Sequence, residues 1–534
     1  MSVRHNSRIR RIYALLAAAL LVLAVSDFRP QVHRSDIVAG PLAWLLASST
    51  DLGPAGAHQI QLTAALHDGH RPESLINWAQ RKGLSVRWRP GDDWAILAGA
   101  PVRIASSLGV TVHDYRGRRG QVFYASPQQP SVPPLLRGDV NGFGRILGYT
   151  PHHLASPPLV PLTDTPKPGL TPGELLTAYN AAELASAGFT GKNATIVFFE
   201  FDGFDQSDLD SFAAMTGLPK FTPTVIGGQP GKPDGETVMD LEVAHAIAPD
   251  ARLVVVNAVP TLQGDGNYEK IAQMFSDADQ RFPGAVWSLS IGWACDRLLT
   301  AADLAPARAA LRQAQAHGTT AFTASGDNGG LQCKSHDDWS SPPGASDVGL
   351  DVIASLPEMT SVGGTTLSTA PGGVWLGEQT WFNSPLSVGS SGGVSALFPR
   401  PAWQRDVTSD RDRDFSKRLT PDIAAVADPL TGLRIVFGKQ IAVGGGTSQA
   451  APIWAALTVV MNQYLTAHGG RPLGMVNPLL YRIASGAPRP AFRDVSLGAN
   501  AVDLAAPGYD LVTGLGPPNL DNLARNLLDL QRAQ

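Results

Sequence analysis

The stretch Ala-Thr-Ile-Val-Phe-Phe at residues 194–199 decides the fold class of this chain. An uncharged run rich in β-branched and aromatic side chains predicts a strand that is buried on both faces. Similar runs follow, and the segments between them have the apolar spacing of helices. This alternation predicts a mainly parallel α/β sheet with helices on both faces. The strands are expected at 194–199, 252–256, 286–290 and 319–325, and the helices at 235–248, 271–279 and 305–317.

Upstream of this region the chain divides into three further parts. Arg4, Arg8 and other basic residues precede an apolar run at 12–25, which is too short for a comfortable membrane span and predicts a secretory signal at 1–26, with an uncleaved anchor as the alternative. Short strand-like and helix-like pieces at 37–149 predict a small α+β domain. Residues 150–172 are rich in proline and predict a stiff linker open to proteolysis, before a main domain at 173–534.

Composition limits the classes of partner and of site. The chain has 534 residues, 43% of them hydrophobic, and a net charge of −4, which gives no reason to expect nucleic acid as a partner. Cys295 and Cys333 are its two cysteines. In an exported chain they suggest one disulfide, with two buried thiols as the alternative, and they are too few for a zinc site of their own.

Ser448 is the strongest candidate for a nucleophile. It lies in Gly-Gly-Thr-Ser-Gln-Ala-Ala-Pro at 445–452, between an apolar strand and a long apolar helix. The free N–H groups at a helix N-terminus favour a developing oxyanion, and Pro452 is expected to fit the first turns of that helix. The alternative is an ordinary Ser/Thr helix cap.

Carboxylates are better candidates than histidine for the base. Glu236 and Asp240 are four residues apart on a predicted helix, so they share a face and can share a proton for acid–base work. The alternative is a solvated helix face with Asp234 as the cap. Asp327 follows a buried strand in Ser-Gly-Asp-Asn-Gly, where a protonated carboxyl group could donate to an oxyanion, although turns also favour Asp. His245 lies within an apolar helix and is expected to be a buried core histidine.

These motifs, in this order, resemble the sedolisins, the serine-carboxyl peptidases with a subtilisin-like fold. The resemblance covers nearly everything after the predicted signal. It is carried by the Glu-x-x-x-Asp pair, the Ser-Gly-Asp loop and the Gly-Thr-Ser motif with Pro452. The blocks Ser-Gly-Gly-Val-Ser at 391–395, Pro-x-Trp-Gln at 401–404 and Pro-Asp-Ile-x-Ala-Val-Ala-Asp-Pro at 421–429 add to it.

The resemblance implies a role for each residue. Ser448 would attack the scissile carbonyl, and Glu236 would be the general base and then the acid. Asp240 would orient Glu236, Asp327 would complete the oxyanion hole with the Ser448 N–H, and Glu200 would extend the proton network. Turn-rich sequence around two carboxylates suits a hard cation. One structural Ca²⁺ would be held by the side chains of Asp494 and Asp510 and the carbonyls of Val495, Ala506 and Gly508.

The resemblance also implies a zymogen. Residues 37–149 look like the family's inhibitory activation domain, which would be removed by cleavage in the linker. Two positions depart from the family pattern. The run Ser-Leu-Ser-Ile-Gly-Trp at 288–293 replaces Ser-x-Ser-Trp-Gly, and Ala506 takes the place of a glycine. The first departure affects substrate preference and the tuning of Glu236.

We therefore predict a secreted, monomeric, acid-acting endopeptidase that hydrolyses proteins or peptides through an acyl-enzyme on Ser448. An aminopeptidase-type exopeptidase of the same fold is one alternative. An Asp-His-Ser subtilase that uses His245 is another. A non-catalytic peptide-binding protein of the same fold is the alternative from a different class.

Overall fold

The computed structural model describes residues 37–56, 59–150, 152–154, 169–334, 344–384, 387–407 and 416–533. The predicted signal at 1–26 and most of the predicted linker lie outside these residues. None of the helices within them is long and apolar enough to cross a membrane.

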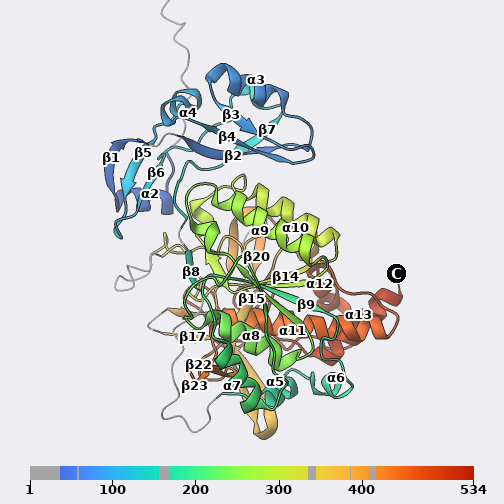
Figure 1. Ribbon diagram of the computed structural model, residues 1–534. Helices are drawn as coiled ribbons and strands as arrows, with labels where there is room; N and C mark the ends of the chain where they lie inside the picture. Colours follow the sequence, from blue (N-terminus) through green and yellow to red (C-terminus); the bar gives the residue numbers. More distant parts are fainter. Residues whose placement is uncertain are drawn as a thin grey trace, which may run out of the picture.

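The N-terminal part folds as a small unit with its own core, drawn in blue in Figure 1. One antiparallel sheet has the order β3-β4-β2-β7, and a second has the order β1-β5-β6. Helices α3 and α4 bury Leu75, Trp78, Ile104 and Leu108 against the first sheet. The elements are α2 (Pro41–Ala47), β1 (Thr50–Pro54), β2 (Ile60–Leu66), α3 (Glu73–Lys82), β3 (Ser85–Arg87), β4 (Trp94–Gly99), α4 (Pro101–Leu108), β5 (His113–Arg116), β6 (Val122–Ala125) and β7 (Val140–Phe143).

The main domain is built on a sheet of eight strands, as the apolar runs predict. Its order is β10-β11-β9-β12-β14-β15, with both β16 and β21 paired to β15. All of these pairings are parallel except that of β15 with β16. The α/β prediction is confirmed. The strands are β9 (Thr195–Glu200), β10 (Thr224–Ile226), β11 (Arg252–Asn257), β12 (Val286–Leu289), β14 (Thr320–Ala324), β15 (Thr360–Ala370), β16 (Val374–Thr380) and β21 (Ile423–Val426).

Helices cover both faces of this sheet, and strand alternation shows which residues face which layer. Ile196 and Phe198 pack with α8 and α11, whereas Val197 and Phe199 pack with α9 and α10. Helix α9 begins four residues before its predicted start, because apolar spacing marks the buried middle of a helix and misses its polar first turn. The main helices are α5 (Pro172–Ala178), α6 (Ala182–Ser186), α7 (Gln206–Thr216), α8 (Glu236–Ile247), α9 (Asn267–Arg281), α10 (Ala305–Ala316), α11 (Gly446–Ala467), α12 (Asn477–Gly486) and α13 (Leu520–Arg532).

The N-terminal unit rests on α9 and α10 (Figure 1). Arg87 forms an ion pair with Glu269 of α9, and Arg312 of α10 forms one with Asp93. The chain then leaves the unit and enters the main domain as β8 (His152–Leu154), which pairs antiparallel with β13 (Ile291–Trp293). Strand β13 begins one residue after Ser290, so the start of the predicted linker lies beside the predicted site.

Candidate active site

The predicted residues converge because three neighbouring parallel strands end at the same edge of the sheet. Strand β9 ends at Glu200, β12 ends just before Ser290, and β14 ends shortly before Asp327. Ligand sites in such sheets lie at the carboxyl ends of the strands. The N-termini of α8 and α11 meet this edge, and the two helices pack against each other. They bring Glu236, at the start of α8, and Ser448 to the same place.

A buried carboxylate from the loop after β9 holds the start of α8. Asp202 accepts hydrogen bonds from the N–H groups of Asp234 at 2.8 Å, Glu236 at 3.2 Å and Thr237 at 3.0 Å. The residue at the cap position is Gly235, whose φ of 111° favours glycine and which offers no side chain. The alternative that Asp234 caps this helix is therefore wrong. Asp202 takes that function from a distant part of the sequence and fixes where Glu236 begins the helix.

The carboxyl groups of α8 are buried, so the alternative of a solvated helix face is also wrong. Glu236 is 2% exposed, and Asp240 and Glu200 are fully buried. Burial raises the pKa of Asp240 well above its ordinary value, and burial together with the charges of Asp240, Asp202 and Glu236 raises the pKa of Glu200 in the same way. Burial therefore favours the protonated form of both carboxyl groups.

Ser448 occupies the first turn of α11 and is fully buried. Gly446, two residues earlier, has a φ of 80°, a conformation that favours glycine. The Ser448 hydroxyl donates to the carbonyl of Ser290 at 3.2 Å. Pro452 lies inside α11, after its first turn, so the prediction that it fits the first turns is wrong. A proline there removes the N–H that would otherwise bond the carbonyl of Ser448.

Asp327 is joined to the residue just before the candidate nucleophile. Its Oδ1 accepts from the backbone N–H of Thr447 at 2.8 Å and from the Thr447 hydroxyl at 2.7 Å. Its Oδ2 is buried and has no hydrogen-bond partner among the described residues. Burial raises the pKa of Asp327 to about 7, although the two bonds from Thr447 oppose this shift. Below that pH the group is a neutral acid with one oxygen free to donate, as an oxyanion site requires.

His245 has a structural environment. Its Nε2 lies 2.7 Å from the carbonyl of Pro219, and its ring stacks on Phe221 with centroids 3.9 Å apart. Burial lowers its pKa. Its Nδ1 has no hydrogen-bond partner in the described part of the chain. His245 therefore makes no hydrogen bond to Ser448 here, which argues against the Asp-His-Ser alternative.

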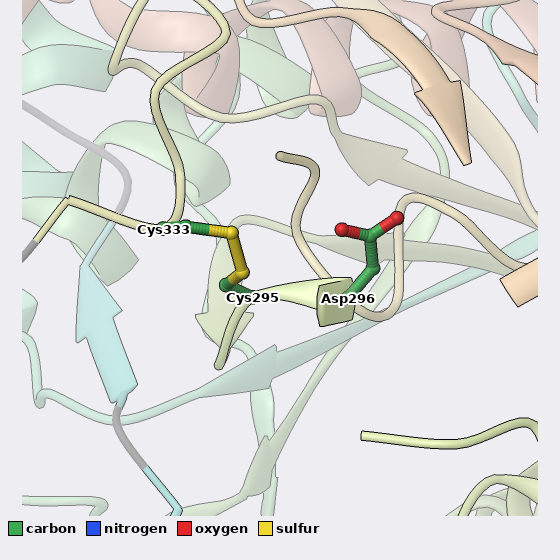
Figure 2. Close-up of side chains that lie close together, drawn as sticks. All are labelled: Cys295, Asp296 and Cys333. Atoms are coloured by element: carbon green, nitrogen blue, oxygen red, sulfur yellow. A yellow bond between two sulfur atoms is a disulfide. The ribbon is translucent and has the colours of Figure 1, made fainter. Parts of the chain in front are cut away.

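Cys295 and Cys333 form a disulfide, with their Cα atoms 5.0 Å apart (Figure 2). The predicted disulfide is therefore confirmed, and the alternative of two buried thiols is wrong. Asp296 lies beside the two sulfur atoms, and the three residues form a group with the proximity of metal ligands. However, sulfur atoms bonded to each other are not thiolate ligands, and the Asp296 carboxylate accepts from the N–H groups of Leu350 and Ala396. This group is therefore a cross-link near the end of β13 rather than a metal centre.

The loops of the predicted calcium site come together near the C-terminus. Asp494 accepts from the N–H of Gly508 at 2.9 Å, and Asp510 accepts from the N–H of Ala506 at 3.2 Å. The carbonyl oxygens of Val495, Ala506 and Gly508 accept no hydrogen bond from the described residues. Burial raises the pKa of Asp510 to about 6, and a cation would oppose that shift. Two carboxylates and three available carbonyls are a donor set that suits Ca²⁺.

Three residues of the site were missed by sequence reasoning, namely Asp202, Ser290 and Thr447. Asp202 follows a predicted strand and Ser290 is the last residue of another, and this position at a carboxyl edge is the signal that could have marked them. Thr447 lies within the Gly-Thr-Ser motif, where a threonine next to a helix start predicts only a helix cap. Their hydrogen-bonding partners are remote in sequence, so spacing alone could not identify them.

Comparison with known proteins agrees with the fold. A model of the subtilase family matches residues 224–472 and, together with the relatives below, supports a serine-type peptidase. Kumamolisin of Bacillus sp. (strain MN-32) is 33% identical over 370 residues, covering 64% of this chain and 62% of that protein. Sedolisin of Pseudomonas sp. (strain 101) is 28% identical over 460 residues, which cover 80% of this chain and 73% of that protein.

Two further relatives are consistent with these matches. The human tripeptidyl-peptidase 1 is 26% identical over 463 residues, which cover 79% of this chain and 76% of that protein. The solved structure of Pseudomonas sedolisin, a serine-carboxyl proteinase in complex with pseudo-iodotyrostatin, aligns with a TM-score of 0.57 at 26% identity over 68% of this chain and 98% of that one. The chain is thus similar in sequence and fold to kumamolisin and to sedolisin, a serine-carboxyl proteinase.

Proposed function

We propose that this chain is a secreted, self-processing endopeptidase that works in acid and uses Ser448 as its nucleophile. The observation that carries the proposal is the meeting of Ser448, the α8 carboxyl groups and Asp327 at one edge of the sheet. Ser290 links the Ser448 residue to Asp240, Asp327 holds the neighbouring Thr447, and the imidazole of His245 is engaged elsewhere. Nucleophilic catalysis needs a base near the hydroxyl and a donor near the oxyanion.

The proposed reaction assigns each proton. The Ser448 hydroxyl turns from the Ser290 carbonyl, gives its proton to Glu236 and attacks the scissile carbonyl carbon. The oxyanion accepts from protonated Asp327 and from the Ser448 N–H, which has no partner within the helix at this position. Glu236 then protonates the leaving amine as the C–N bond breaks. Water attacks the acyl-enzyme in the same way, with Glu236 as the base again.

The zymogen proposal rests on β8. This segment, at the start of the predicted linker, pairs in antiparallel register with β13, with Leu154 opposite Ile291. Addition of a strand to an exposed edge is a common mode of peptide binding. Because β13 follows Ser290, β8 occupies a place beside the site that a peptide substrate would need. Cleavage within the linker, on the C-terminal side of β8, would release it together with the N-terminal region.

The same contact favours an endopeptidase over an exopeptidase. The segment on β13 is internal, and the chain continues from it in both directions. A cleft that accepts an internal segment does not require a free chain end. The similarity to tripeptidyl-peptidase 1 supports the exopeptidase alternative, so the choice is a matter for experiment.

We further propose that one structural Ca²⁺ binds at Asp494 and Asp510 with the carbonyls of Val495, Ala506 and Gly508. The available carbonyl oxygens support this assignment. The ion would cross-link two loops far from the reacting atoms, so its contribution would be to stability.

The test uses the full chain and its Ser448→Ala variant, incubated at acidic pH. We expect the wild type to shorten itself by cleavage within 150–172, and the variant to stay intact until wild-type protein is added. The processed enzyme should then cleave a fluorogenic peptide that is blocked at both ends. Cleavage of peptides with a free amino terminus only would favour the exopeptidase. No cleavage of any peptide in acid would refute the peptidase proposal.

A further inference from the structure

Ser290 lies between Asp240 and the candidate nucleophile, Ser448. It is fully buried in the segment after β12. Its Oγ is 2.6 Å from Oδ2 of Asp240 and 3.1 Å from the backbone carbonyl oxygen of Ser448. Its own carbonyl accepts the Ser448 hydroxyl at 3.2 Å. Ser290 therefore contacts both Asp240, from the proposed acid–base group, and Ser448, the proposed nucleophile.

The carbonyl of Ser448 needs a donor because of Pro452. In an α-helix the N–H of residue i bonds the carbonyl of residue i−4, and the residue four positions after Ser448 is a proline without an N–H. A buried carbonyl without a donor is costly. The hydroxyl of Ser290 takes the place of the missing N–H, as the 3.1 Å distance shows.

Two acceptors thus compete for one hydroxyl proton. A serine hydroxyl has a single proton to donate, and the carbonyl of Ser448 can only accept. When Oδ2 of Asp240 is ionised, it also only accepts and attracts the proton of Ser290 away from Ser448. When Oδ2 carries a proton, Asp240 donates to Ser290, and Ser290 donates to the Ser448 carbonyl.

We propose that Ser290 is a positioning residue that couples the protonation of Asp240 to the placement of Ser448. A proton on Asp240 closes a chain of bonds from Asp240 through Ser290 to the first turn of α11. Loss of that proton releases the carbonyl of Ser448 and loosens the turn that carries the nucleophile. The inference rests on the proposed function, because it assigns a regulator to the same nucleophile.

The groups that surround Asp240 support a proton at this position. The groups that interact electrostatically with Asp240 or with Glu200 are all acidic. They are Glu200 from β9, Asp202 from the loop after β9 and Glu236 from α8 itself. Burial acts in the same direction. On another element packed against α8, Asp208 of α7 is held by the N–H groups of residues 438 and 439.

The main test compares Ser290→Ala with a matched control, Ser288→Ala. Ser288 lies two residues earlier in β12, is equally buried, and its hydroxyl has no partner among the described residues. We expect Ser290→Ala to lower kcat about two- to tenfold, the effect of losing the neutral hydrogen bond to the Ser448 carbonyl, with little change in KM. The limb of the pH profile that depends on Asp240 should move to higher pH, because the carboxylate loses its donor. Ser290→Thr, which keeps the hydroxyl, should keep the wild-type profile.

A second variant tests the reverse change. Pro452→Ala supplies the missing N–H to the Ser448 carbonyl and leaves the hydroxyl of Ser290 free for Asp240. The limb of the pH profile that depends on Asp240 should therefore move to lower pH. Adding Ser290→Ala to Pro452→Ala should change kcat less than Ser290→Ala does in the wild type. If Ser290→Ala does not fold, Pro452→Ala alone decides the question.

A readout that does not need turnover separates this inference from the proposed function. The infrared band of the protonated carboxyl group, assigned with Asp240→Asn, gives the titration of Asp240 in the folded chain. We expect a higher pKa in Ser290→Ala than in Ser288→Ala. Equal titration and equal pH profiles in these two variants, or an unchanged profile in Pro452→Ala, would overturn the inference. An inactive wild type with the expected titration shifts would overturn only the proposed function.

Discussion

Replacing Asp327 with asparagine should separate hydrogen-bond donation from acidity at the proposed oxyanion site. The bonds from Thr447 hold Oδ1 as an acceptor, so any proton on the carboxyl group resides on Oδ2. Asparagine can keep its carbonyl at the Oδ1 position and place its NH₂ group where Oδ2 was. Asp327→Asn is therefore a nearly isosteric variant that always donates, whereas Asp327→Ala never donates.

The pH dependence follows from the raised pKa. Burial raises the pKa of Asp327 from 3.8 to about 7, so the wild type keeps its oxyanion donor in acid and loses it as pH rises through about 7. We expect the alkaline limb of the kcat profile to lie near that pH in the wild type and to move to higher pH in Asp327→Asn. At acidic pH Asp327→Ala should lose about 10²–10³ in kcat, the usual effect of removing one oxyanion donor.

Stability gives a second measure of the same proton. Below pH 3.8 Asp327 is protonated in both the folded and the unfolded chain, so it contributes no pH dependence. Between pH 3.8 and about 7 the folded chain holds a proton that the unfolded chain releases, and the free energy of unfolding falls as pH rises. The total loss is about 4 kcal/mol once pH exceeds 7. Asp327→Asn should avoid it and should melt at a higher temperature than the wild type in alkaline solution.

The measurements are peptide hydrolysis by the processed enzyme across pH, and thermal unfolding of the Ser448→Ala background across the same range. An alkaline limb at the same pH in the wild type and in Asp327→Asn would refute the reasoning about activity. A melting temperature of Asp327→Asn that follows the wild type at every pH would refute the raised pKa itself.

Three other perturbations have clear expected outcomes. His245→Ala should keep most of the peptidase activity and lose about 1–3 kcal/mol of unfolding free energy, because it removes a stacked ring and a hydrogen bond; a loss of activity equal to that of Ser448→Ala would instead support the Asp-His-Ser alternative. Reduction of the Cys295–Cys333 disulfide, which closes a separation of 38 residues, should lower the free energy of unfolding by about 3–4 kcal/mol in a denaturant titration, and an unchanged midpoint would argue against the cross-link. Chelation of calcium should lower the melting temperature of the wild type but not that of Asp494→Asn; with calcium at 100 times its Kd the effect is about 3 kcal/mol, and identical melting curves with and without chelator would exclude the site.

The sequence was sufficient for the fold because the relevant information is local. Uncharged β-branched runs and helical spacing record which faces of each segment are buried. They predicted the strands β9, β11, β12 and β14 and the helices α8 and α10 to within about two residues. They also placed Glu200 and Asp327 at strand ends, where sites form.

The same local information failed where a group depends on a remote partner. Helix α8 reads equally well as a solvated helix, and only the packing of α11 and the sheet around it shows that every residue in it is buried. The Pro452 motif reads as a helix start, and only the hydroxyl of Ser290 explains how a proline is accepted inside the helix.

By itself the sequence determined the order of the strands along the chain, the residue types available for catalysis and the two cysteines that could pair. Tertiary structure decided which of these groups meet. Asp202 caps a helix 35 residues away, and Ser290 reaches Asp240 over 50 residues and Ser448 over 158. The physical reason is that burial periodicity is a property of one segment, whereas a hydrogen bond depends on the distance between two segments. That distance is set only when the sheet brings the ends of the two segments together.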